Sequence, residues 1–112
     1  MNKISVALIR GNGMNSWEGR AWNDLPGDIK VTGYCANNNL YPTDDLKYPL
    51  VRLKTSTDCK LAGKLSTFFG IFQKMAGLEN ILKDYEIAHT VEIYNYYTYQ
   101  AALAKKQNPK LR

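Results

Sequence analysis

A nearly continuous apolar segment at the start of the chain constrains the fold more than any other feature. Residues 4–9 read ISVALI, and the segment stops at the glycine-rich turn Arg10-Gly11-Asn12-Gly13. A strand with almost no polar positions is typical of one that is covered on both faces, as in a parallel sheet. The segment therefore predicts a central strand with helices packed on both sides of its sheet.

Three further segments predict strands. Residues 29–35 alternate between apolar and polar side chains, residues 50–53 follow an Asn-rich, Pro-containing loop, and residues 85–92 form the third segment. The last three residues, 110–112, look like the first step of one more strand. Because helical patterns separate most of these strands, parallel pairing through right-handed crossovers is favoured. We expect a three-layer α/β fold with a mostly parallel four-stranded sheet in the order 3-2-1-4.

Three segments predict helices. A short helix is expected over residues 15–24, capped by its first or second residue, and a last helix over residues 95–106. The segment 57–83 carries apolar residues at largely helical spacing with lysines between them, and predicts a long amphipathic helix broken near Gly77. Cover over the sheet explains this apolar stripe best, although contact with a membrane surface or a partner helix explains it too.

Composition and charge indicate one globular domain with an almost neutral body. The chain has 112 residues, 45% of them hydrophobic, and a formal net charge of +5, so a single core is expected. Four basic residues lie in the last eight positions, which leaves only +1 on residues 1–104. The basic character is therefore largely a property of the C-terminal tail, and we expect no nucleic-acid partner.

The residue inventory also bears on metals and location. Cys35, Cys59 and His89 cannot supply the four ligands of a structural zinc site, and their spacing fits no zinc motif, so no metal is expected. No apolar run has the length of a membrane span, and the N-terminus lacks the pattern of a signal peptide. We expect a cytoplasmic protein and leave peripheral attachment to a membrane surface open.

Two loops are expected to meet at one edge of the sheet. Ligands of open parallel sheets bind beyond the carboxyl ends of the strands, where residues 10–18 and 92–96 follow the first and fourth strands. Glycines and free N–H groups at a helix start would attract an anion, yet Ser16 replaces the third glycine of the dinucleotide fingerprint and no P-loop is present. A tight turn and an exposed loop carboxylate explain the same residues without a ligand. The candidate ligand-binding residues are Gly11, Asn12, Gly13, Asn15, Trp17, Glu18, Glu92 and Tyr94.

The order of these motifs resembles a known family. Residues 4–22, ISVALIRGNGMNSWEGRAW, resemble the opening of family 4 type glycosyltransferases of the GT-B fold, in which an apolar strand ends in an arginine-glycine turn before an Asn-x-Trp-Glu helix start. Asn15-Ser16-Trp17-Glu18 carries that match. The likeness continues through residues 28–33, 50–53, 85–89 and 97–102 and so spans nearly the whole chain.

The resemblance implies one Rossmann-like, acceptor-side domain, incomplete over residues 1–112, of a retaining and metal-independent glycosyltransferase that needs no cofactor. Gly11, Asn12 and Gly13 would lie near the donor phosphates, and Glu92 and Tyr94 would line the acceptor side. The expected ligands are a nucleotide sugar and a sugar or lipid-linked acceptor. Nothing in the chain corresponds to the family's second domain, so that domain or a partner chain would be required, and no catalytic residue is identified. The alternative is a small stand-alone α/β interaction or ligand-binding module.

Overall fold

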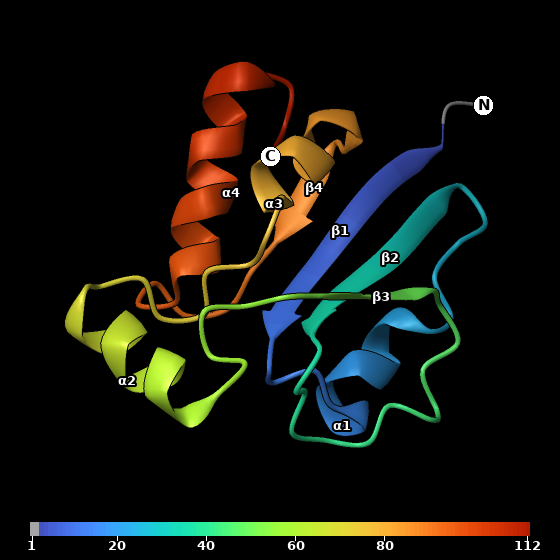
Figure 1. The fold of residues 1–112 in the computed structure, drawn as a ribbon. Coiled ribbons are helices and arrows are strands. Elements are labelled where there is room, and N and C mark those ends of the chain that lie inside the picture. The colour runs from blue at the N-terminus through green and yellow to red at the C-terminus, as the bar shows by residue number, and fades with distance from the viewer. Residues whose placement is uncertain (1–2) are drawn as a thin grey trace.

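A computed structural model describes residues 3–112, apart from the side chain of Ala62, and contains one all-parallel sheet (Figure 1). The strand order is β3-β2-β1-β4, as predicted from the sequence. The central strand β1 pairs with β2 on one side and with β4 on the other. The strands are β1 (Ile4–Gly11), β2 (Ile29–Ala36), β3 (Leu50–Leu53) and β4 (Ile87–His89).

The two faces of β1 belong to two separate apolar cores, which gives the fold its three layers. Ala7 and Ile9 pack with residues from α3, η2 and α4, whereas Val6 and Leu8 belong to the core that is covered by the segment around α1 and η1. Period-two alternation along the strand therefore determines which helix covers which face. This is an α/β, Rossmann-like partial fold. The helical elements are α1 (Ser16–Gly19), η1 (Arg20–Trp22), α2 (Lys60–Phe68), α3 (Leu78–Ile81), η2 (Leu82–Asp84) and α4 (Tyr96–Gln107).

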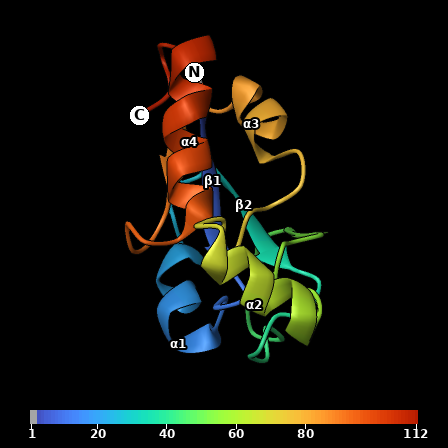
Figure 2. The same ribbon diagram turned by 60° about the vertical axis from the view of Figure 1, so that its left-hand side comes forward.

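The long helix predicted over residues 57–83, with a break near Gly77, is wrong between residues 69 and 77: α-helix is formed only over residues 60–68 and, directly after Gly77, over residues 78–81. The helix α2 ends at Phe68, and residues 74–76 run antiparallel to residues 54–56, with a bridge between Thr55 and Met75. The face of the sheet that carries Ala7 and Ile9 is covered by α3 and α4 instead. The helix α2 lies beyond the carboxyl end of the sheet in both views (Figures 1 and 2). As a result, the apolar side chains of α2 stay exposed; Phe68 is 81% accessible.

The chain end adds backbone contacts to the outer edge of β4. The N–H of Arg112 donates to the carbonyl of Glu86 at 2.8 Å, and the N–H of Ala88 donates to the carbonyl of Arg112 at 2.8 Å. Leu111 is buried beside them. The structure assigns no strand to residues 110–112, where one was predicted to start, but these two bonds hold Arg112 against the edge of β4. Within the described residues, no helix is both long and apolar enough to cross a membrane.

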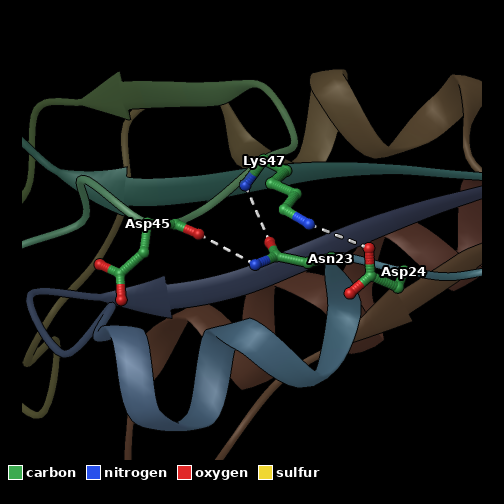
Figure 3. A network of polar contacts seen from close by, with 4 residues as sticks. All are labelled: Asn23, Asp24, Asp45 and Lys47. Carbon is green, nitrogen blue, oxygen red and sulfur yellow. Dashed lines mark hydrogen bonds and ion pairs between the residues drawn. The ribbon is translucent and has the colours of Figure 1, made fainter.

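The long loop between β2 and β3 is pinned to the end of η1 by one asparagine (Figure 3). The Asn23 side chain donates to the carbonyl of Asp45 at 2.9 Å and accepts from the N–H of Lys47 at 2.8 Å. Lys47 also forms an ion pair with Asp24 at 3.1 Å. Both charged groups are exposed, so the ion pair contributes little stability, and the two bonds to Asn23 fix this part of the loop against the end of η1.

Candidate functional site

A hollow of about 400 Å³ lies at the carboxyl ends of β1 and β4, where the sequence predicts the ligand crevice. Its walls come from residues 10–18 and 91–97, together with Tyr41, Phe72 and Gln73. A larger hollow of about 530 Å³ lies at Ser5, Lys30 and Tyr85 and contains none of the predicted site residues. Seven of the eight candidates line the hollow at the carboxyl ends: Asn12, Gly13, Asn15, Trp17, Glu18, Glu92 and Tyr94.

A chain of buried polar side chains forms the floor of this hollow. Gln73 accepts from the N–H of Asn12 at 2.8 Å and donates to the side-chain oxygen of Asn95 at 3.3 Å. The Asn95 amide donates to the Tyr97 hydroxyl at 2.8 Å, and that hydroxyl donates to the carbonyl of Val91 at 3.1 Å. Burial raises the pKa of Tyr97 to about 12. Because each group has a partner, the network holds the floor in one arrangement.

Backbone conformation at the hollow is unusual at two residues that are not glycine. Gln73 has φ of +58° and Glu92 has φ of +61°. Residues other than glycine rarely adopt this left-handed backbone conformation. Backbone strain of this kind clusters at functional sites. Gly11, the eighth candidate, also has a positive φ of +55° and lies directly under the Gln73 side chain. Sequence reasoning missed Gln73 because its position falls inside the helix predicted over residues 57–83.

The glycine-rich loop does not offer its backbone amides to a ligand as expected. The N–H of Asn12 is taken by Gln73, the N–H of Gly13 by the carbonyl of Arg10 at 3.0 Å, and the N–H of Met14 by Asn39 at 2.9 Å. The helix α1 that follows is a single turn. Asn15 caps it by accepting from the N–H of Glu18 at 2.9 Å, which confirms the predicted cap. These three loop amides are therefore not available to hold an anion.

Arg10 is a further residue of the hollow that sequence reasoning did not single out as a site residue. The residue as a whole is only 7% accessible. One guanidinium nitrogen, Nη1, donates to the carbonyl of Ile9 at 3.0 Å and lies 3.2 Å from Nδ1 and 3.3 Å from the carbonyl oxygen of His89. Burial lowers the pKa of Arg10, and nearby Tyr97 and Glu18 oppose that shift. The signal in the sequence was a lone charge at the end of an apolar strand.

Aromatic side chains form the rim. Trp17 is 60% accessible and meets Tyr41 edge to face, with ring centroids 5.1 Å apart. Tyr94 is exposed, and its hydrogen bond to the Glu92 carboxylate raises the pKa of its hydroxyl. Exposed aromatic rings beside polar groups can stack on a ligand with an apolar face and a polar edge. The hollow thus combines aromatic faces, amides, two carboxylates and one guanidinium.

Within residues 3–112, no three His, Cys, Asp or Glu side chains gather in the way that a metal ion requires. Comparison of the chain with protein-family models, curated proteins and solved structures gives no match.

Proposed function

We propose that this chain is the acceptor-side domain of a GT-B type glycosyltransferase and that the hollow at the carboxyl ends of β1 and β4 holds a sugar. One observation carries the proposal: the exposed Trp17–Tyr41 pair and the Glu92–Tyr94 pair border the same hollow. Sugar rings present apolar faces to aromatic rings, and their hydroxyls donate to carboxylates and amides. The volume of the hollow lies within the range of small-molecule sites.

In this proposal, the chain binds a sugar, and the transfer of the sugar requires a second domain or a partner chain. In the proposed enzyme, a nucleotide-sugar-binding domain or partner chain would close over the hollow, and transfer would retain the configuration of the sugar. The resemblance in residues 4–22 supports this assignment. Cys35 is a buried thiol, which suits the cytoplasm, and we propose that location.

Sugar binding can be tested on the isolated chain through amide NMR shifts, which also apply to a variant that lacks Trp17, and in the native chain through tryptophan fluorescence. We expect saturable changes with at least one of glucose, galactose, mannose, N-acetylglucosamine or their UDP conjugates. Trp17→Ala should weaken binding about ten-fold or more, because stacking on an aromatic ring contributes one to a few kcal/mol. Tyr99→Ala removes another exposed aromatic ring, on α4 and outside the hollow, and should leave affinity unchanged. Equal affinity of both variants would contradict the proposal.

A second function is favoured by the exposed face of α2, and we propose that this face docks on an anionic membrane surface. Leu61, Leu65 and Phe68 are exposed, as is Phe69, which follows the helix. Residues 59–78 contain three lysines and no acidic residue. Apolar side chains flanked by lysines are the pattern of helices that lie in the interface of an anionic bilayer.

Vesicle sedimentation tests this second proposal. We expect binding to vesicles that contain phosphatidylglycerol and much weaker binding to pure phosphatidylcholine vesicles. The double variant Phe68→Ser, Phe69→Ser should remain in the supernatant, whereas Tyr99→Ser should sediment like the native chain. Self-association of the native chain that the double variant abolishes, without vesicle binding, would instead identify a second copy as the occupant of this face.

A further inference from the structure

The charge of Arg10 is buried beside the hollow without a carboxylate partner. Only 7% of the surface of this residue is accessible to solvent. The ion pair that the structure contains within residues 3–112 joins Lys47 and Asp24 on the surface. A buried charge is costly unless an opposite charge or a full set of hydrogen bonds compensates it. The partners of the guanidinium therefore decide what this residue does.

Those partners engage only one side of the guanidinium. The group has five N–H donors, and its three hydrogen-bond contacts, to Ile9 and His89, all belong to Nη1. No hydrogen bond of Nε or Nη2 is formed within the described residues. Every fully buried side-chain nitrogen or oxygen in that part of the chain has a partner, so Nε and Nη2 keep contact with open space. Arg10 is among the residues that line the hollow, which is open space beside this side chain.

The free edge formed by Nε and Nη2 has the geometry that binds an oxyanion through two parallel hydrogen bonds. The amides of Asn12, Gly13 and Met14 are already engaged, so the guanidinium is the cationic donor that the hollow offers. Glu18 and Glu92 line the same hollow and would repel a ligand that carries negative charge throughout. A ligand that suits both needs one oxyanion for Arg10 and hydroxyl donors for the carboxylates.

We infer that Arg10 binds a single oxyanion, a phosphate ester or a carboxylate, carried by the hydroxylated ligand of this hollow. The inference rests on the proposed function for the sugar part of the ligand, and it adds the class of that sugar: a sugar phosphate or a uronic acid. Binding by the Arg10 guanidinium differs from phosphate binding by a glycine-rich loop, where backbone amides hold the phosphate. Here the loop amides already have hydrogen-bond partners.

Matched probes test the inference on the native full chain. Binding of glucose, glucose 6-phosphate, glucuronic acid and inorganic phosphate is measured by calorimetry or NMR shifts at several salt concentrations. We expect the phosphate or the uronic acid to bind at least about ten-fold more tightly than glucose, as charged hydrogen bonds of this kind supply. The advantage should shrink as salt rises. Tighter binding of glucose 6-phosphate would identify a phosphate ester as the oxyanion, and tighter binding of glucuronic acid would identify a carboxylate.

Two variants of Arg10 and one control variant, at Arg52, assign the effect. Arg10→Gln should bring the affinity for the anionic sugar down to that for glucose, and Arg10→Lys should recover only part of the difference because it lacks the planar fork. Arg52→Gln removes an exposed arginine outside the hollow and should change nothing. If Arg10→Gln does not fold, the affinities of the native chain for glucose and its two derivatives still decide whether the hollow prefers an anionic sugar.

The outcomes separate this inference from the sugar proposal. Equal affinity for glucose and both derivatives overturns the role of Arg10 and leaves sugar binding in place. Tight binding of inorganic phosphate that Arg10→Gln abolishes, without any sugar binding, supports the role of Arg10 and contradicts the sugar proposal. Absence of binding by all four probes overturns the inference.

Discussion

The side-chain oxygen of Gln73 lies where a β-carbon on Gly11 would be. That β-carbon would also come within 2.9 Å of Cε1 of Tyr97, and Gly11 has φ of +55°. The same Gln73 oxygen accepts from the N–H of Asn12 at 2.8 Å. The absence of a side chain at position 11 thus allows the segment after α2 to close the floor of the hollow against the end of β1.

Gly11→Ala should lower the free energy of unfolding by about 3 kcal/mol, because alanine resists the left-handed region and its methyl group overlaps Gln73 and Tyr97. Urea denaturation measures the change. Gly27→Ala is the matched control, since a β-carbon there meets nothing within 4 Å, and it should shift the free energy by less than about 0.5 kcal/mol. Equal stability of the two variants would contradict the close packing at Gly11.

Gln100→Ala should also destabilise the fold, by about 2 kcal/mol or more. Gln100 is fully buried in α4; its side chain accepts from the N–H of Met75 at 2.8 Å and donates to the carbonyl of Met75 at 2.8 Å. Alanine would leave the buried N–H of Met75 without a partner and its carbonyl with only the longer hydrogen bond from the N–H of Leu78 at 3.4 Å. Gln107→Ala, at the exposed end of the same helix, should have almost no effect on the urea midpoint. A small loss in both variants would show that Met75 is not held in this way.

The imidazole of His89 should titrate below its ordinary pKa of 6.5, owing first to desolvation and then to the charge of Arg10. The guanidinium only donates, so the bond at 3.2 Å requires Nδ1 of His89 to be unprotonated. Because the folded pKa lies below the unfolded one, the unfolded state binds more protons, and stability should fall as pH drops below about 6.5.

This titration is easy to follow because the chain contains a single histidine. Proton NMR of the imidazole gives the pKa directly, and Arg10→Gln should raise it toward 6.5. An unchanged pKa in that variant would remove Arg10 as a cause. His89→Gln should abolish the part of the stability change below about pH 6.5 that this residue contributes.

Truncation to alanine should lower the free energy of unfolding much more at Leu82 than at Phe68. Leu82 is fully buried in the core beneath α4, whereas Phe68 is 81% accessible on α2. Leu82→Ala should cost about 3 kcal/mol, and Phe68→Ala less than about 0.5 kcal/mol. Thermal and urea denaturation would check both. A large loss for Phe68→Ala would restore the prediction that this stripe covers the sheet.

Local patterns were sufficient wherever one strand or one cap carried the signal. The apolar segment 4–9 identified the central strand, the residues of strand β3 were predicted with the bounds that the structure shows, and Asn15 was one of the two residues predicted as the cap. The gathering of the candidates around one hollow also followed, because the carboxyl ends of parallel strands meet at one edge. Whether these residues bind a ligand stays a prediction.

The sequence by itself identified the strands, because alternation and turns act over a few residues. The parallel α/β pattern then predicted their order and the edge at which the candidates gather. Only the tertiary structure decided the path of residues 69–77, the exposure of α2 and the burial of Arg10 and Gln73 in the wall of the hollow. Segments 54–56 and 74–76, which flank α2 in the sequence, pair with each other. Gln100 forms two hydrogen bonds with the backbone of Met75, 25 residues away. Helical spacing in residues 57–83 contains no trace of these long-range hydrogen bonds, which outweighed the local preference for a helix.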